Sequence, residues 1–342
     1  MKMAWKEMRK YKLRYTILGS IIFLISLLTL SISGLANGLS QDNAALIKNM
    51  PEGTFYMEES AEENHSFSAL SDEQISNLKE EDPNATLFSI QMGEFNDASD
   101  QKHNLAFVSA SDNEYFPETE PGEIVLDQAF EEEGFKIGDT ISSGLLDKEL
   151  TITGFAEEEK FSHSSVGFIN NEDFFEMYNT DTFQLAFTTE TDQPIDELSA
   201  FGNGDFLNTI PSYSAEQLSL NMIIVFLYVI SGMLFAIFFY MINVQKLGTF
   251  GILKAIGVKT SALFKMMWAQ MFIITIISLL LAVGISQLFN VLAPSGMPFH
   301  LTLNMVMLSS LAFIIIGFIG ATLSGIQIKK VEPMQAINQG GA

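Results

Sequence analysis

The sequence predicts a membrane protein with four transmembrane α-helices and a large α+β extracytoplasmic domain inserted between helices 1 and 2. The first reason is charge: 39 of the 41 acidic residues lie between Asp42 and Glu216, where only 6 Lys oppose them and the net charge is −33. The rest of the chain carries 12 basic residues against Glu7 and Glu332, a net charge of +10. The second reason is that long uncharged apolar runs separate these two regions, as a low-dielectric barrier between two aqueous compartments requires.

The apolar runs are long enough to give four spans. Thr16–Gln41 and Gln217–Gln245 contain no Asp, Glu, Lys or Arg, and at about 1.5 Å per residue each can cross roughly 30 Å of hydrocarbon. Met266–Ile328 is also uncharged but is too long for one helix. Because Asn290–His300 is a turn rich in Pro and Gly, this run is expected to fold back as two spans.

These runs set the predicted domain boundaries. The segments are a cytoplasmic amphipathic helix (1–15), transmembrane helix 1 (16–38), the extracytoplasmic α+β domain (39–217), transmembrane helix 2 (218–244), a cytoplasmic coupling segment (245–265), transmembrane helix 3 (266–289), an extracellular loop (290–301), transmembrane helix 4 (302–327) and a cytoplasmic tail (328–342).

Basic residues flanking the spans predict the orientation. They precede the first span, lie between the second and third, and follow the fourth, so with four spans all three groups fall on one side. The positive-inside rule places that side in the cytoplasm, with both termini, and makes the chain a multi-pass cell-membrane protein. The alternative for the first run is a signal peptide cleaved after Gly34-Leu35-Ala36, but the run exceeds the roughly 7–15 apolar residues usual for one.

The inserted domain has no cysteine, so its own hydrophobic core must hold it together. Short or alternating apolar runs predict strands, and Ser71–Glu80 predicts a helix opened by a Ser71–Gln74 capping box. The predicted strands are Glu123–Asp127, Glu149–Phe155, Ser165–Ile169 and Phe183–Phe187. The acidic residues are interpreted as a solvated outer face, because along the sequence they are scattered and not grouped with histidines.

No catalytic motif is present. The chain lacks a phosphate-binding Gly-x-x-x-x-Gly-Lys-Ser/Thr run, a His-Glu-x-x-His pair and a Gly-x-Ser-x-Gly elbow. The four histidines are not at metal-ligand spacing, and Ser162-His163-Ser164 has no identifiable third partner. We therefore expect a protein that is not an enzyme, with no intrinsic cofactor, no metal site and no nucleic-acid partner.

The coupling segment after the second span is short, basic and apolar in alternation. Phe250, Leu253 and Ile256 follow each other at three-residue spacing, and the glycines around them permit close backbone approach. Such a helix could lie on the inner leaflet or dock in a groove on a soluble partner. The residues alone leave both interpretations open.

The order of one span, a large outer domain and three further spans resembles the FtsX-like permeases, which include the MacB and LolC/LolE transporters of the ABC class. Phe250–Thr260 and Lys329–Ile337 carry this resemblance. Further segments are similar to permeases of haem efflux pumps in Gram-positive bacteria, although antimicrobial-peptide exporters share the same frame. These segments are Lys6–Tyr15, Ser33–Gly38, His163–Ser165, Tyr213–Gln217, Leu220–Met222 and Met297–Phe299.

The resemblance implies a homodimer that binds two copies of a separate ATPase subunit, which would supply ATP hydrolysis through mechanotransmission. It implies that the N-terminal helix lies on the inner membrane surface beside the ATPase, and that substrate enters from the outer leaflet. The ATPase-coupling residues it implies are Phe250, Gly251, Leu253, Lys254 and Gly257. Alternatives within the same superfamily are an exporter of antimicrobial peptides or lipids, and a non-transporting regulator of a cell-wall hydrolase.

The resemblance implies haem as the transported ligand. This is physically plausible, because haem is a flat apolar macrocycle with an iron that His, Met or Tyr can bind. Tyr213 and Met222 would lie about 14 Å apart on one continuous helix, so only one of them could reach the iron. Glu216 is expected to hydrogen-bond within the protein, since a free carboxylate would repel a haem propionate. The candidate substrate-binding residues are Met50, Tyr56, Met57, His163, Tyr213 and Met222.

Overall fold

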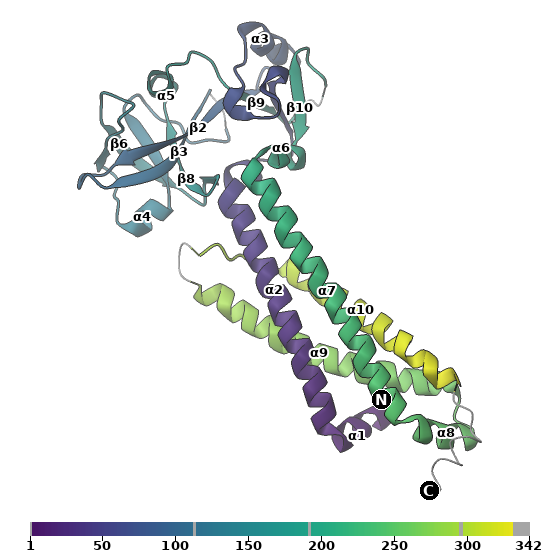
Figure 1. The fold of residues 1–342 in the computed structure, drawn as a ribbon. Helices are drawn as coiled ribbons and strands as arrows, with labels where there is room; N and C mark the ends of the chain where they lie inside the picture. Colours follow the sequence, from purple (N-terminus) through teal and green to yellow (C-terminus); the bar gives the residue numbers. More distant parts are fainter. Residues whose placement is uncertain (1, 112–113, 191–192, 294–296, 331–342) are drawn as a thin grey trace. The chain divides into compact units, whose positions relative to one another are not determined.

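The computed structural model describes residues 2–111, 114–190, 193–293 and 297–330. The chain divides into two compact units, each described by itself. The helical unit contains Met1–Asn37 and Ser219–Ala342, and the inserted unit contains Gly38–Leu218. The inserted unit therefore occupies nearly the same residues as the domain predicted at 39–217 (Figure 1).

Long helices build the helical unit, and two of them continue into the inserted unit. Four are long and apolar enough to cross a membrane, within Lys12–Lys48, Ser212–Gln245, Thr260–Leu292 and Leu303–Ile326. This confirms the predicted number of spans. The helices are α1 (Lys2–Lys10), α2 (Lys12–Lys48), α7 (Pro211–Gln245), α8 (Leu247–Ala255), α9 (Thr260–Leu292) and α10 (Leu303–Lys330).

The ends of these helices differ from the simple prediction in two places. The N-terminal segment is two helices and not one, because the chain bends at Tyr11, and Tyr15 belongs to α2. Helix α10 runs on to Lys330. Residues 294–296 of the predicted loop and 331–342 of the predicted tail lie outside the described residues, as does most of the Lys329–Ile337 motif.

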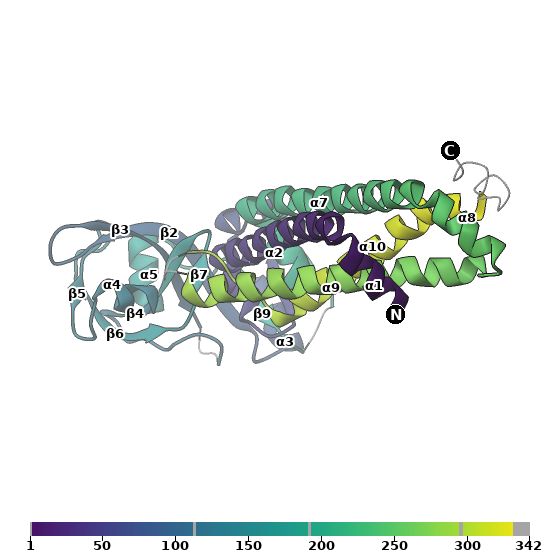
Figure 2. The ribbon, with the colours of Figure 1, turned by 90° about the horizontal axis from the view of Figure 1, so that it is seen from below.

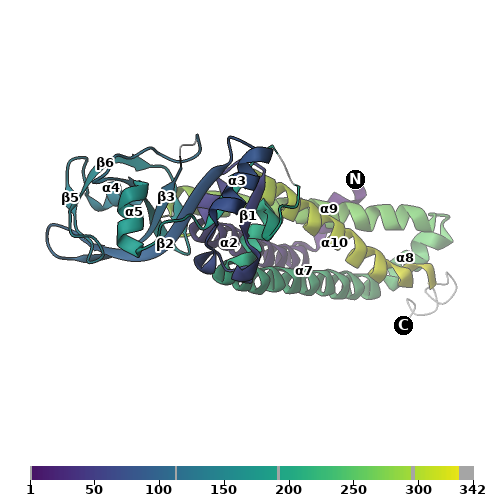
Figure 3. The ribbon, with the colours of Figure 1, turned by 90° about the horizontal axis from the view of Figure 1, so that it is seen from above.

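Glycines allow close packing inside the helical unit. Helix α10 runs along α9 (Figure 3), and it also approaches α7, where a Cβ built on Gly320 would lie 2.8 Å from Cβ of Phe235 and 3.1 Å from the carbonyl oxygen of Gly232. Small residues at such crossings are the usual way for membrane helices to bring their backbones together. A larger residue at Gly320 would therefore push α7 and α10 apart.

Two of the motifs that carried the resemblance contact each other. Gly34 of α2 lies under the ring of Phe299, which a Cβ would approach to 2.6 Å. The carbonyl oxygen of Gly34 accepts a hydrogen bond from the His300 amide at 3.0 Å, and the Asn37 side chain donates to the His300 carbonyl oxygen at 3.0 Å. The Ser33–Gly38 and Met297–Phe299 segments thus form one packing unit, which their sequence separation did not reveal.

The inserted unit is built on a mixed sheet with short helices around it (Figure 1). The sheet order is β10-β1-β9-β2-β3-β8-β4-β6-β5, with β7 paired to β8. The strands are β1 (Thr54–Glu58), β2 (Thr86–Asn96), β3 (Lys102–Ala110), β4 (Glu123–Asp127), β5 (Thr140–Ile141), β6 (Leu150–Ala156), β7 (Lys160–Phe161), β8 (Ser164–Ile169), β9 (Leu185–Thr188) and β10 (Leu198–Gly202). The helices are η1 (Glu59–Ala61), η2 (His65–Phe67), α3 (Asp72–Glu81), α4 (Ala129–Glu133), α5 (Asn171–Tyr178) and α6 (Asn203–Thr209).

The α+β class is confirmed, and so are the strands predicted from apolar runs, which correspond to β4, β6, β8 and β9. The Ser71 capping box is also present: the Ser71 hydroxyl accepts from the Gln74 amide, and the Gln74 side chain accepts from the Ser71 amide. The prediction lacked β2 and β3, which pair along nine residues in antiparallel register. An Asp97 side chain that accepts from the Ser99 and Gln101 amides closes the turn between them.

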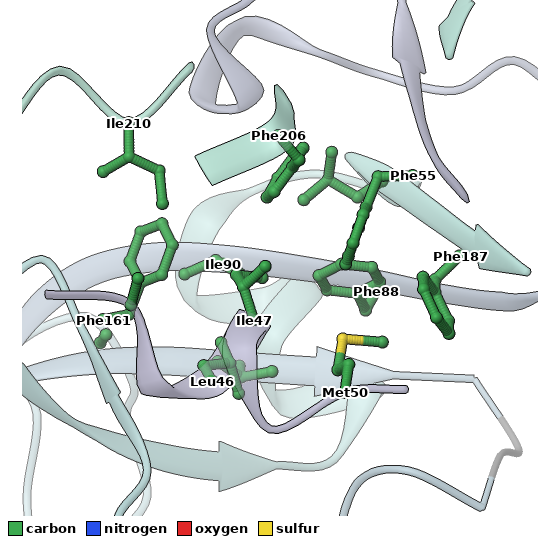
Figure 4. Packing of buried hydrophobic residues seen from close by; sticks show 14 of the residues in the cluster. Leu46, Ile47, Met50, Phe55, Phe88, Ile90, Phe161, Phe187, Phe206 and Ile210 are labelled. Carbon is green, nitrogen blue, oxygen red and sulfur yellow. The ribbon is translucent and has the colours of Figure 1, made fainter. Parts of the chain in front are cut away.

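One aromatic cluster forms a large part of the core of the inserted unit. Phe55 of β1 stacks on Phe206 of α6 with ring centroids 4.5 Å apart, and Phe187 of β9 lies 4.8 Å from Phe55 on another side (Figure 4). Ile47 and Met50, from the end of α2 and the residues after it, pack into the same cluster. The residues that follow the first span are therefore part of the core of this unit.

Helix α2 is interrupted before it reaches this core. Ala44 has non-helical backbone angles, φ −148° and ψ 25°, and the preceding carbonyl, that of Asn43, accepts a hydrogen bond from the Ser162 amide at 2.7 Å. This carbonyl is therefore satisfied by the β7–β8 turn. A kink at Ala44 separates the long part of α2 from its last turn.

Candidate substrate and coupling sites

The turn between β7 and β8 is strained and carries His163. Ser162 and His163 both have positive φ, 50° and 63°, and they connect strands that pair Phe161 with Ser164. A two-residue hairpin of this kind normally contains Asn or Gly, which tolerate left-handed backbone angles. Strain at a non-glycine pair persists only where the surroundings hold it, and it is often found at functional positions.

His163 lies between two carboxylates that come from different ends of the inserted unit. Its Nδ1 is 3.2 Å from Oδ2 of Asp42, which precedes the kink in α2. Its Nε2 is 2.8 Å from Oε1 of Glu216, on the first turns of α7. One histidine thus joins the segment that enters the inserted unit to the segment that leaves it.

Three further contacts complete the group. The Lys160 ammonium donates to Oδ1 of Asp42 at 2.8 Å. Buried Asn43 donates to Oε2 of Glu216 at 3.4 Å and accepts from the Ser212 hydroxyl at 3.1 Å. We call Asp42, Asn43, Lys160, His163 and Glu216 the base cluster.

Charge in the base cluster favours the protonated form of His163. Partial burial alone would lower the pKa of the imidazole, but the hydrogen bonds to Glu216 and Asp42 outweigh it and raise the pKa above its ordinary value of 6.5. The Asn43 side-chain amide nitrogen also lies 3.1 Å from Nε2, so Nε2 contacts both an amide and the Glu216 carboxylate, whereas Nδ1 contacts Asp42. A protonated imidazole has no lone pair to give to a metal.

A few of the acidic residues nevertheless lie beside histidines in the fold. Asp42 and Glu216 lie on either side of His163, and Asp97 lies 3.4 Å from His103. The fold therefore groups carboxylates with histidines that are far from them in the sequence. Over the part of the chain that the structure describes, no group of three or more His, Asp or Glu is arranged to hold a metal ion. The expected internal hydrogen bond of Glu216 is confirmed.

Most of the other predicted substrate residues are in the interior of the inserted unit. Met50 is 7% exposed and belongs to the aromatic core cluster, as does fully buried Met57. Tyr56 is also fully buried, but in a second cluster with Leu70 and Leu78, and its hydroxyl donates to the Gln193 carbonyl at 2.8 Å. The structure therefore does not bring Met50 and Tyr56 together at one surface.

Tyr213 and Met222 are both on α7, which is one uninterrupted helix. The Tyr213 ring is half-buried against the aromatic core cluster, and its hydroxyl accepts from Ser40 at 3.3 Å. Met222 is 53% exposed and belongs to the helical unit. Nine residues of helix separate the two, or about 14 Å.

Helix α8 contains four of the five predicted coupling residues, all but Gly257, and its two faces differ. Phe250 and Gly251 are buried, and Leu253 packs partly against the same core of the helical unit. Ile252 and Ile256 are instead 54% and 72% exposed. The three-residue spacing of Phe250, Leu253 and Ile256 therefore does not mark a single exposed face, because the first two residues attach the helix to its own bundle. Composition could not distinguish these faces, since both are apolar.

Gly257 ends α8 for a backbone reason. Its φ is +95°, and no heavy atom lies within 4 Å of a Cβ built on it. The Gly257 amide donates to the Lys254 carbonyl and the Val258 amide to the Leu253 carbonyl, as in a glycine-terminated helix. Glycine is required here by the left-handed conformation and not by a close neighbour within the chain.

Buried polar contacts connect α8 to the N-terminal helices. The Lys246 ammonium, just before α8, is 2.6 Å from Oε1 of Glu7 on α1 and donates to the Tyr15 hydroxyl at 2.9 Å. Gln270 of α9 accepts from that hydroxyl at 3.0 Å and donates to Glu7 at 2.7 Å. Burial lowers the pKa of Lys246, and the hydrogen bond to Glu7 opposes that shift. Glu7 is thus engaged inside the unit, a pairing that the sequence analysis did not predict.

Comparisons with known proteins agree with this architecture. The family model for the FtsX-like permease C-terminal region matches residues 221–333. A "Putative hemin transport system permease protein HrtB" of Staphylococcus haemolyticus (strain JCSC1435) is 32% identical over 352 residues, covering 98% of this chain and 99% of that protein. A relative of the same name from Staphylococcus epidermidis (strain ATCC 12228 / FDA PCI 1200) is 28% identical over 354 residues, covering 99% and 100%.

One solved structure also overlaps with this chain. The periplasmic region of MacB from Actinobacillus actinomycetemcomitans has a TM-score of 0.33 and 9% sequence identity, covering 46% of this chain and 92% of that one. This likeness is too weak to bear on the fold.

Four membrane-length helices, a sheet-rich unit between the first and second, and the FtsX-like match define a multi-pass permease subunit of the ABC class. The near-full-length similarity defines the family more narrowly. The chain belongs to the HrtB permeases.

Proposed function

We propose that this chain is the permease subunit of an efflux pump that exports haem from the outer leaflet by mechanotransmission. The observation that carries the proposal is the similarity, over 98% of the chain, to a relative whose name assigns it to hemin transport. The chain itself would not be an enzyme. A separate ABC ATPase subunit would hydrolyse ATP, with two copies bound to a permease homodimer.

The proposed orientation places both termini and α8 in the cytoplasm and the inserted unit outside. The charge asymmetry supports it, since the inserted region is strongly acidic and the segments flanking the spans are basic. In this orientation α8 would meet the ATPase through Ile252 and Ile256, whose exposed side chains extend away from the bundle core. Phe250 and Leu253 would transmit the resulting motion into the bundle.

For haem contact we propose the outer part of α7, with Tyr213 and Met222. Met222 is exposed, and the half-buried Tyr213 is only weakly tied through Ser40. Met50 and Tyr56 would need a rearrangement of the inserted unit to reach a ligand, because both are buried. His163 would have to leave Glu216 or Asp42, with the freed nitrogen unprotonated, before it could bind iron.

The experiment is a haem titration of the purified permease, followed by its Soret band. Tyr213→Ala and Met222→Ala should each weaken binding, because one removes a possible ligand and the other a ring contact. Met233→Ala is the matched control, since Met233 is 61% exposed on the same helix about 16 Å beyond Met222. It should bind like the wild type.

Two results would count against this proposal. Wild-type binding no stronger than that of empty detergent micelles would remove haem as the cargo and favour a peptide or lipid exporter, or a regulator of a cell-wall hydrolase. Unchanged binding in both Tyr213→Ala and Met222→Ala would remove this part of α7 as the site.

A further inference from the structure

A cavity in the helical unit lies between α1, α2 and α9, on residues with no part in the proposed haem contact. Its volume is about 490 Å³, within the range of roughly 300–1,000 Å³ that is usual for ligand pockets. Helix α1 packs against α9 at this position (Figure 2). The Ser278 hydroxyl donates to the Gly19 carbonyl at 2.8 Å and holds α2 against α9 on the cavity wall.

The cavity is polar at one end and apolar along its length. Arg9 of α1 and Lys12, the first residue of α2, lie at the polar end, and Phe23, Ile277 and Leu281 line the apolar part. From Lys12 to Phe23, α2 rises about 16 Å. Half of a hydrocarbon core of roughly 30 Å is about 15 Å, so the lined length matches one leaflet.

The electrostatic environment of the cavity is positive. The only acidic residues of the helical unit are Glu7 and Glu332, and Glu7 is already paired with Lys246. Exposed Arg9 and Lys12 have no carboxylate partner among the described ion pairs of this unit. The cavity therefore has an unneutralised cationic end, which suits an anionic group.

Trp5 lines the cavity and is 55% exposed. An exposed Trp between a basic helix and an apolar surface is typical of the membrane interface, where its ring lies at headgroup level. This places the polar end of the cavity at headgroup depth and its apolar end among the acyl chains. A ligand in it would have an anionic head and a long apolar tail.

We propose that this cavity binds an anionic glycerophospholipid, with its phosphate on Arg9 and Lys12 and one acyl chain along Phe23, Ile277 and Leu281. A second copy of the helical unit fits less well, because it would bring more cations to the same place and no free carboxylate. The lipid would attach α1, and through Glu7 also Lys246 before α8, to the membrane surface. Assignment to the cytoplasmic leaflet rests on the proposed orientation, but the class of lipid does not.

The test uses the full-length permease alone in nanodiscs, without ATPase or haem, and measures quenching of Trp5 by brominated phosphatidylglycerol and by brominated phosphatidylcholine. The wild type should prefer phosphatidylglycerol. Arg9→Gln with Lys12→Gln should reduce this preference by about fivefold for each cation removed. The matched control, Lys6→Gln with Lys10→Gln, removes two exposed charges of α1 that do not line the cavity and should keep the preference.

A third variant tests the apolar part of the site. Ser20→Phe should lower the quenching by both lipids, because exposed Ser20 lines the cavity and a ring there would fill it. Equal quenching of wild-type protein by the two lipids would overturn the proposal. An equal loss of preference in the Lys6/Lys10 control would also overturn it, because diffuse surface charge would then explain the binding. In a separate arm with haem added, displacement of phosphatidylglycerol by haem would assign the cavity to haem instead.

Discussion

Glu159 lies beside the strained His163 turn, in an environment that disfavours its charged form. Burial raises its pKa to about 7, against an opposing hydrogen bond from Asn49, and nearby Asp127 raises it further. Its Oε2 atom is buried and has no hydrogen-bond partner. The ionised form of the Glu159 carboxyl is therefore poorly stabilised by its surroundings.

This environment predicts pH-dependent stability. The folded-state pKa of Glu159 exceeds its ordinary value of 4.5, so the unfolded chain loses its proton first as pH rises. The stabilisation is complete below pH 4.5 and is lost as the pH rises to about 7. We expect amide exchange over residues 159–166 of the full-length protein to report a local opening free energy that falls by about 3 kcal/mol across this window.

Glu159→Gln should remove most of that slope, because its side chain cannot titrate. The neighbouring Glu158 is exposed, so Glu158→Gln serves as the control and should keep the wild-type slope. An unchanged slope in Glu159→Gln would assign the pH dependence elsewhere, with His163 the next group to test. Absolute stabilities are less informative, since a buried Gln amide would itself lack a partner.

At residue scale, the sequence predicted the Ser71 capping box because all its parts lie within four residues. It did not predict the base cluster, whose carboxylates are 121 and 53 residues from His163. It also did not predict that Ser162 and His163 would form a left-handed turn, since neither residue is typical of one. Contacts between residues close in sequence can be predicted from it, whereas the contacts of His163 join residues far apart and depend on the completed fold.

The end of helix α8 gives the element-scale prediction. At Gly257 a leucine would have to adopt φ +95°, at a cost of roughly 1–2 kcal/mol, whereas asparagine adopts left-handed angles more readily. We expect Gly257→Leu to reduce coupling of ATP hydrolysis to export and Gly257→Asn to behave nearly like the wild type. Lys254→Ala should have a smaller effect than Gly257→Leu, because it leaves the helix end unchanged.

The measurement is ATPase pull-down together with export by proteoliposomes for each variant. Loss of pull-down in both Gly257→Leu and Gly257→Asn would contradict the backbone explanation. It would indicate that the ATPase approaches Gly257 so closely that no side chain fits. Normal export by Gly257→Leu would remove this residue from the coupling segment altogether.

At element scale, strongly apolar runs gave four spans, and four of the strands were recognised from their patterns. The strands β2 and β3 were not recognised, because their pairing depends on the turn closed by Asp97. The faces of α8 could not be predicted, because burial of Phe250 and exposure of Ile256 depend on where the bundle lies. Periodicity predicts that an element exists better than it predicts which other elements it packs against.

Orientation is the prediction for the whole molecule. The chain contains no cysteine, so single cysteines can be introduced at exposed Ser60 in the inserted unit and exposed Ser261 near the start of α9. In intact cells an impermeant thiol reagent should label the Ser60→Cys protein and not the Ser261→Cys protein, and permeabilised cells should label both. Labelling of both positions in intact cells would contradict the four-span topology.

The two ends of the inserted unit meet at His163, and this has a consequence for how the protein is made. Helices α1 and α2 leave the ribosome first, but α9 and α10 follow only after the roughly 180 residues of the inserted unit and the rest of α7 and α8. At about 5–20 residues per second, α2 waits on the order of ten seconds or more for them. Because the end of α2 and the start of α7 are joined at His163, the inserted unit can close during that wait without α9 and α10. The same closure makes it a module that evolution could exchange between permeases while keeping the bundle.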